Sequence, residues 1–231
     1  MTHPKGRSWY VTFLLLMKGI LKLKTCEFGD PESGIILIQP VDDHDLDCIE
    51  NEFAEIRKSC SMNIRLIAVQ IGDWNNDLSP WEALPVFGKE GFLGKAQGTL
   101  DELLRLCGSK EKAYCIGGYS LAGLFALWAA YRTDIFRGVA AASPSMWFLG
   151  FADFMKNNEI RTNTVYLSLG KKEEKAKNPT MATVGDRIRE AYEHLKAKGI
   201  NCALEWNEGN HFRDADLRTA RAFSWVIKNG F

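Results

Sequence analysis

The amino-acid sequence predicts an α/β protein with a mostly parallel central sheet and helices on both of its faces. Short apolar runs alternate along the chain with segments whose apolar residues recur at helical spacing. Several of these runs, such as 34–39, are continuously apolar, which is typical of strands buried on both faces. The length of 231 residues is that of one α/β domain, and we therefore expect a single domain over residues 1–231.

Six or seven strands and five helices are expected. The first strand begins near Ile20 and ends at a turn containing Gly29 and Pro31. The later strands are expected at 34–39, 63–71, 114–116, 138–142, 164–169 and 201–206. Helices are expected at 45–58, 95–106, 124–130, 182–198 and 215–227. The loop 72–81 is long and rich in turn-forming residues, so we expect it to be functional.

The charge balance argues against binding to polyanions. Lys plus Arg and Asp plus Glu both number 29, so the formal net charge is zero. A protein that binds nucleic acid or an anionic membrane usually carries a clear positive excess. We therefore expect no nucleic acid or membrane partner, and a small molecule as the substrate.

The N-terminal segment has the outline of a signal peptide, because basic residues precede an apolar run at 9–17. Lys18 and two further lysines follow that run, and no small-residue cleavage site comes after it. The run is also shorter than the ~18 residues that a membrane-spanning helix needs. We expect a cytoplasmic protein in which residues 1–19 form an N-terminal extension or a first strand.

The cysteines do not follow the spacing of a metal site or a redox motif. No C-x-x-C pair is present, and several cysteines lie inside apolar runs, where cysteine behaves as a small hydrophobic residue. We expect all six to be reduced core residues: Cys26, Cys48, Cys60, Cys107, Cys115 and Cys202.

A strand, a sharp turn and a buried helix are predicted around Ser120, in the stretch Gly-Tyr-Ser-Leu-Ala-Gly from Gly118 to Gly123. The nucleophile-elbow signature is G-x-S-x-G, from which this stretch departs by one methyl group at Ala122. A glycine-rich turn without chemistry is the alternative. A nucleotide phosphate loop is excluded, because Ser120 stands where G-x-G-x-x-G requires its second glycine.

The partners of a catalytic serine on a parallel sheet should follow later strands, since the site lies at the carboxyl ends of the strands. His211 directly follows the last expected strand, whereas His194 lies on the polar side of a helix and is expected to be a surface residue. Glu173 and Glu174 follow the strand at 164–169. We prefer Glu173 as the carboxylate, with Glu174 and a merely solvated charged loop as alternatives.

Two main-chain donors are expected to hold the oxyanion of a tetrahedral intermediate. One normally belongs to the residue after the nucleophile and the other to the loop after an earlier strand. Leu121 and Val41 occupy these positions.

Taken together, these motifs resemble those of α/β-hydrolases of the esterase family that includes enterochelin-esterase-like and feruloyl-esterase-like enzymes. The resemblance covers roughly residue 35 to the C-terminus. It is carried by the elbow, by Ala-Ser-Pro-Ser-Met-Trp-Phe ending at Phe148, by Leu-Gly-Lys-Lys-Glu ending at Glu173, and by Gly-Asn-His-Phe around His211. The resemblance implies an α/β-hydrolase fold without a large lid domain, with Ser120 as nucleophile, His211 as general base and then acid, and Glu173 as the orienting carboxylate.

The sequence thus predicts a carboxylic ester hydrolase that transfers the acyl group to water, without a cofactor or metal. Trp74, Trp81, Trp147 and Phe148 are expected to line an aromatic pocket or else to serve only in packing. An acyltransferase or peptidase on the same scaffold is an alternative, because only the acceptor or the leaving group would differ. A binding module that has the fold without the activity is another.

Overall fold

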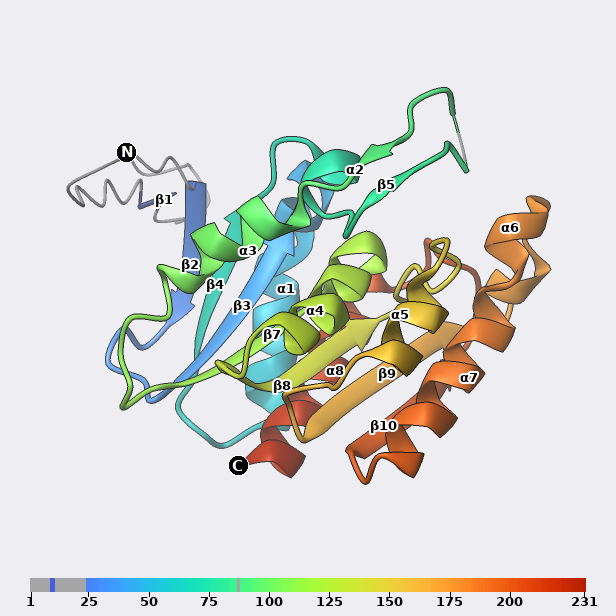
Figure 1. Ribbon diagram of the computed structural model, residues 1–231. Coiled ribbons are helices and arrows are strands. Elements are labelled where there is room, and N and C mark those ends of the chain that lie inside the picture. Colours follow the sequence, from blue (N-terminus) through green and yellow to red (C-terminus); the bar gives the residue numbers. More distant parts are fainter. Residues whose placement is uncertain (1–8, 11–23, 87) are drawn as a thin grey trace.

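The computed structural model describes residues 9–10, 24–86 and 88–231. An eight-stranded sheet has the order β1-β2-β4-β3-β7-β8-β9-β10, and a short pair, β5 and β6, lies apart from it (Figure 1). The strands are β1 Trp9–Tyr10, β2 Lys24–Gly29, β3 Ile35–Val41, β4 Arg65–Gln70, β5 Glu82–Ala83, β6 Phe92–Leu93, β7 Ala113–Tyr119, β8 Phe136–Ala142, β9 Thr164–Gly170 and β10 Asn201–Asn207. The helices are α1 Asp43–Ser59, α2 Trp74–Asp77, α3 Ala96–Leu104, α4 Ser120–Arg132, α5 Phe151–Asn157, the 3₁₀ turn η1 Glu173–Lys175, α6 Pro179–Ala182, α7 Val184–Ala197 and α8 Ala215–Gly230.

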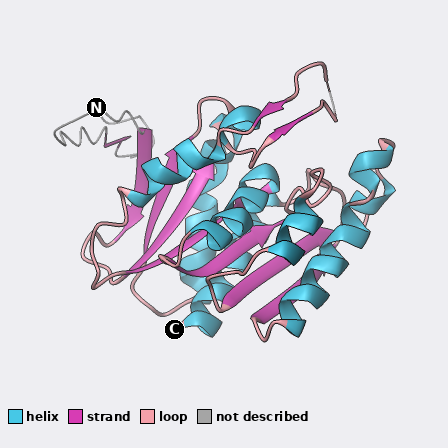
Figure 2. Cartoon of the chain, viewed as in Figure 1, coloured by secondary structure: helices cyan, strands magenta, loops and turns pink. Residues whose placement is uncertain are grey.

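The sheet is parallel from β4 across to β10, and at the other edge β2 runs antiparallel to both of its neighbours, β1 and β4. Helices α1 and α8 cover one face, and α3, α4, α5 and α7 cover the other (Figures 1 and 2). Two apolar cores result, one on each face of the sheet. The predicted fold class, a mostly parallel sheet with helices on both faces, is confirmed.

The order in which strands are added to the sheet reverses between β3 and β7, and this reversal determines where the site lies. The chain leaves β3 through α1 to β4 on one side, and later returns to β7 on the other side of β3. The connections that leave β3 and β7 therefore pass to opposite faces of the sheet. Ligand sites of open α/β sheets lie outside the carboxyl ends of the strands at such a switch point.

Most predicted elements agree with the structure to within a few residues, and the differences have local causes. The expected edge strand corresponds to β2, although residues 20–23 lie outside the described residues, as do most of residues 1–19. The loop at 72–81 contains the short helix α2. Helices α5 and α6 were not predicted, because they are too short to show a helical period in the sequence.

The cysteines form no disulfide with one another. Cys26, Cys60 and Cys115 are buried, as expected. The expectation that all six lie in the core is wrong for Cys48, which is exposed because it falls on the solvent side of the amphipathic helix α1. None of the described helices combines the length and the apolar character that crossing a membrane requires.

A buried carboxyl group lies between α1 and the sheet. Glu52 on α1 is 4% exposed, and its Oε2 accepts a hydrogen bond from the side-chain amide of Gln39 at 3.3 Å. Glu52 Oε1 and Gln39 Oε1 have no hydrogen-bond partner among the described residues. Burial raises the pKa of Glu52 well above its usual value, so the protonated carboxyl group is favoured. Its hydroxyl can then donate to an oxygen that otherwise lacks a donor.

We predict that Glu52→Gln stabilises the protein increasingly as the pH rises. A carboxyl group whose pKa is raised by folding contributes its full stability below the unfolded value of ~4.3, and this contribution is lost as pH rises through the folded pKa. Glutamine does not ionise, so the variant does not lose this stability as the pH rises. The gain in unfolding free energy should be negligible near pH 4 and should increase steadily toward pH 8.

Chemical denaturation of both forms across this pH range measures the difference. Asp47→Asn on the exposed side of α1 is the control and should show no comparable pH trend. A gain that is the same at every pH would contradict the assignment of a buried protonated carboxyl group to Glu52.

Candidate active site

Ser120 lies at the sharp turn between β7 and α4, with a left-handed backbone of φ 57°. A residue other than glycine adopts such a conformation only where the surrounding structure enforces it. The turn points the side chain out of the sheet at the N-terminus of α4, where free N–H groups and the helix dipole favour negative charge. This is the geometry expected of a nucleophile elbow.

Close packing around the turn explains its small residues. A Cβ atom on Gly118 would lie 2.7 Å from the Ala122 Cβ atom, and one on Gly123 would lie 2.9 Å from the carbonyl oxygen of Gly118. The strand and the helix can therefore meet only if residues 118 and 123 lack side chains. The methyl group of Ala122 fits because residue 118 is glycine, so the departure from G-x-S-x-G leaves the turn intact.

His211 is brought to Ser120 by the loop after β10. Its Nε2 lies 3.0 Å from Ser120 Oγ. The loop turns at Gly209, which has φ 98°, and Tyr119 donates a hydrogen bond of 2.7 Å from its hydroxyl to the carbonyl oxygen of His211. His194, by contrast, is half-buried on α7 and does not line the site.

Glu173 completes a hydrogen-bonded chain with His211 and Ser120. It lies in η1, just after β9, and its Oε2 is 2.7 Å from Nδ1 of His211. The other oxygen, Oε1, accepts hydrogen bonds from the Gly170 amide at 2.7 Å, Ser143 Oγ at 2.9 Å and Arg218 Nη1 at 3.2 Å. Three donors on one oxygen fix the carboxylate so that the other oxygen faces the imidazole.

Glu174 lies differently from its neighbour. Its Oε2 accepts a hydrogen bond of 2.7 Å from Arg189 on α7, and its side chain packs against Gly185. The carboxylate that the structure brings to His211 is therefore that of Glu173. The sequence favoured Glu173 without excluding Glu174. In the structure Glu173 is the glutamate that contacts His211.

Four polar residues around the chain of hydrogen bonds were not predicted: Tyr119, Ser143, Ser145 and Arg218. The Oγ of Ser145 lies 3.3 Å from that of Ser120, and Arg218 is 1% exposed. Burial, followed by the charge of Glu173, raises the pKa of Tyr119 to about 12, so its hydroxyl stays protonated and can donate. The two serines lie in a motif after β8 that the sequence singled out, whereas nothing in the sequence distinguished Arg218 from Arg221, the exposed arginine of α8.

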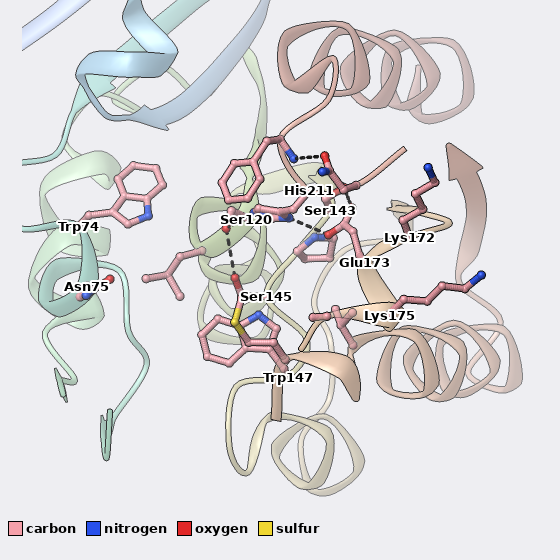
Figure 3. A pocket seen from close by; sticks show the side chains of 17 residues that line it. Trp74, Asn75, Ser120, Ser143, Ser145, Trp147, Lys172, Glu173, Lys175 and His211 are labelled. Carbon is pink, nitrogen blue, oxygen red and sulfur yellow. Dashed lines mark hydrogen bonds and ion pairs between the residues drawn. The ribbon is translucent and has the colours of Figure 1, made fainter. Parts of the chain in front are cut away.

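A cavity of about 620 Å³ opens at Ser120 and His211 (Figure 3). The predicted pocket residues Trp74 and Trp147 line it, and so does Leu121. Figure 3 shows Trp74 on one side of Ser120, and Lys172 and Lys175 on the other with their ammonium groups directed away from the serine. The further apolar residues that line it are Pro144, Ala176, Met181, Val184 and Phe212.

Phe148 and Trp81 do not line this cavity, so the structure does not place them with the other predicted pocket residues. Phe148 is 2% exposed, and its ring packs edge-on against those of Trp81 and Phe92, at centroid distances of 5.7 Å and 5.2 Å. These aromatic rings pack against one another as part of the core on this face of the sheet. Apolar residues next to a site are needed for its support as well as its lining, and the sequence does not distinguish the two.

Val41 lies at the carboxyl end of β3 and is fully buried, outside the lining of the cavity. Its carbonyl oxygen accepts a hydrogen bond of 2.9 Å from the amide of Ile71. The following amide, that of Asp42, is bonded to the Asp45 carboxylate at the start of α1. The role of the Val41 amide as an oxyanion donor stays a prediction.

The arrangement supports proton transfer from Ser120 to His211. Within the described parts of the chain, no three His, Cys, Asp or Glu side chains form a group able to hold a metal ion. With its proton on Nδ1 facing Glu173, the His211 imidazole can accept the hydroxyl proton of Ser120 through Nε2. A carboxylate beside Nδ1 stabilises the imidazolium that this transfer forms.

No family model and no curated protein sequence matches the chain. Many solved structures are similar to it, including the following three. A siderophore hydrolase, EstA from Aspergillus nidulans, has a TM-score of 0.70 and 18% identity over 100% of this chain and 98% of that one. An IroE-like serine hydrolase from Shewanella oneidensis has a TM-score of 0.67 and 13% identity, covering 96% and 79% of the two chains.

The third is the enterobactin esterase FES from Shigella flexneri, with a TM-score of 0.62 and 14% identity over 98% of this chain and 61% of that one. At such low identities the shared property is the fold. The resemblance found in the sequence is thereby confirmed at the level of architecture: the chain has the α/β-hydrolase fold of these esterases and serine hydrolases.

Proposed function

We propose that this protein is a serine hydrolase of carboxylic esters. The observation that carries the proposal is the chain of hydrogen bonds from Ser120 through His211 to Glu173, at 3.0 Å and 2.7 Å, on the wall of the cavity. A solvated loop would not bury Glu173 to 7% exposure and give both of its carboxylate oxygens hydrogen-bond partners. The esterase names of the similar structures point to the same reaction.

In the proposed mechanism, His211 removes the hydroxyl proton of Ser120 as the oxygen attacks the ester carbonyl carbon. The imidazolium is stabilised by Glu173 and then protonates the departing alcohol oxygen. A water molecule, deprotonated by the same imidazole, attacks the carbonyl carbon of the acyl-enzyme. The bond from that carbon to Ser120 Oγ then breaks, Oγ takes the proton back from the imidazolium, and the carboxylic acid is released. Bonds and protons balance without any cofactor.

The negative charge of the tetrahedral intermediate is proposed to lie at the start of α4. The Leu121 amide follows the nucleophile and belongs to the first turn of that helix, whose N–H groups lack partners within the helix. Val41 remains our proposal for the second donor. Removal of one oxyanion donor typically costs about 100-fold or more in rate.

The substrate is proposed to be a small ester with an aromatic or short acyl group. Trp74, Trp147 and Phe212 offer aromatic surface, and the cavity of about 620 Å³ is in the range of small-molecule sites. The named siderophore hydrolase and enterobactin esterase suggest esters of iron-chelating compounds as the first candidates to assay.

We further propose that the chain forms a single domain and that the protein is cytoplasmic, because lysines follow the N-terminal apolar run.

We predict that Ser120→Ala abolishes ester hydrolysis while the protein stays folded. Loss of the nucleophile should reduce the hydrolysis rate of p-nitrophenyl acetate by on the order of 10⁴-fold or more. A fluorophosphonate probe should label the native protein at Ser120 and leave the variant unlabelled. Retention of full activity by the folded variant would refute the proposal.

Two other outcomes would favour the alternative functions. A native protein that the probe does not label would indicate a binding module. Transfer of the acyl group to an added alcohol or amine in preference to water would indicate an acyltransferase.

We predict unequal losses for the two neighbouring glutamates. Glu173→Gln should lower kcat by on the order of 10³-fold, because a neutral amide can hold the wrong imidazole tautomer and cannot stabilise the imidazolium. Glu174→Gln is the matched control and should stay within about twofold, since its carboxylate pairs with Arg189 at the surface. Steady-state kinetics on one ester measures both, and a larger loss at residue 174 would overturn the assignment.

A further inference from the structure

One buried cation lies behind the site, on the side of Glu173 away from His211. Arg218 projects from α8, and its side chain is 1% exposed. Such a charge is strongly unfavourable in the interior unless it is paired and hydrogen-bonded. The hydrogen-bond partners of the Arg218 guanidinium group therefore show which parts of the chain it links.

Its first terminal nitrogen, Nη1, contacts three side chains of the site. It lies 3.0 Å from the Tyr119 hydroxyl, 3.2 Å from Glu173 Oε1 and 3.3 Å from Ser143 Oγ. These residues come from the ends of β7, β9 and β8, so a single nitrogen contacts three neighbouring strand ends. The close approach at Glu173 requires Gly170, where a Cβ atom would lie 3.0 Å from Nη1.

The second terminal nitrogen, Nη2, holds the loop that carries the histidine. It donates to the carbonyl oxygens of Glu208 and Asn210, at 2.9 Å and 3.0 Å. Tyr119, itself a partner of Arg218, donates to the carbonyl oxygen of His211 at 2.7 Å. The guanidinium group thus holds the backbone before the imidazole directly, at Glu208 and Asn210, and the carbonyl group of His211 through Tyr119.

We propose that Arg218 is a positioning residue that fixes both Glu173 and His211 for reaction with Ser120. A planar guanidinium can do this because it presents donors in a rigid fork, to the carboxylate on one side and to the loop on the other. Lysine would supply the charge at one point and could not span both. The inference rests on the proposed ester hydrolysis.

The alternative is that Arg218 only stabilises the fold. A structural role would change the unfolding free energy and the amount of folded protein, and kcat per folded site would be unchanged. A positioning role lowers kcat and leaves KM for a small ester nearly constant, because Arg218 does not line the cavity. Misplacement of catalytic groups by about 1 Å costs on the order of 100-fold in rate.

The test compares Arg218→Met and Arg218→Lys with Arg221→Met, an arginine on the same helix whose partners Asn207 and Glu205 lie outside the site. Hydrolysis of p-nitrophenyl acetate is measured per folded active site, counted by exhaustive fluorophosphonate labelling. We expect kcat to fall by on the order of 100-fold in Arg218→Met and about 10-fold in Arg218→Lys, with KM within about threefold. Arg221→Met should retain its kcat. Equal kcat values for native protein and folded Arg218 variants would overturn the inference.

If Arg218→Met does not fold, Arg218→Lys is tested alone and in combination with Glu173→Gln. Residues that act as one unit give losses smaller than the product of the single losses, whereas independent residues give the product. We expect the double variant to lose less activity than the product of the two single losses. A combined loss equal to that product would overturn the inference. A native protein that fluorophosphonate does not label would instead refute the proposed hydrolysis.

Discussion

The left-handed backbone at Ser120 is the constraint on which the rest of the site depends. It allows the chain to turn from β7 into α4 within one residue, at the point where strand order reverses. The turn requires close contact between strand and helix, which Gly118 and Gly123 permit. Its strained conformation persists because β7 and α4 are almost wholly buried, so α4 can move only if the core on its face of the sheet is disturbed.

Parallel register then brings the other groups to the same edge of the sheet. Strands β7, β8, β9 and β10 are successive neighbours, and each contributes one part of the site from the loop at its carboxyl end. Those parts are Ser120, Ser143, Glu173 and His211. Because neighbouring strands in a sheet lie only ~4.8 Å apart, short loops are enough to bring these side chains into contact.

This regularity explains what the sequence could predict. Strand ends are recognisable from apolar runs, so position indicated Ser120 and His211 and narrowed the carboxylate to Glu173 or Glu174, and the structure brings Ser120, His211 and Glu173 together. The contacts of Arg218 could not be predicted, because they join the start of the last helix to four strand ends and leave no local pattern. Phe148 shows the same limit, since a sequence indicates an aromatic residue near a site but not the direction of its ring.

Two buried glutamates show how their surroundings determine what a carboxyl group can do. Glu52 has a neutral amide as its side-chain partner, and burial raises its pKa, so the protein stabilises the neutral acid. Glu173 has a guanidinium group at 3.2 Å and an imidazole at 2.7 Å. A buried ion pair contributes little net stability compared with an apolar pair of equal volume. The Arg218–Glu173 pair is therefore better explained by the alignment of His211 than by the stability of the fold, and selection for stability alone would favour its replacement by apolar residues.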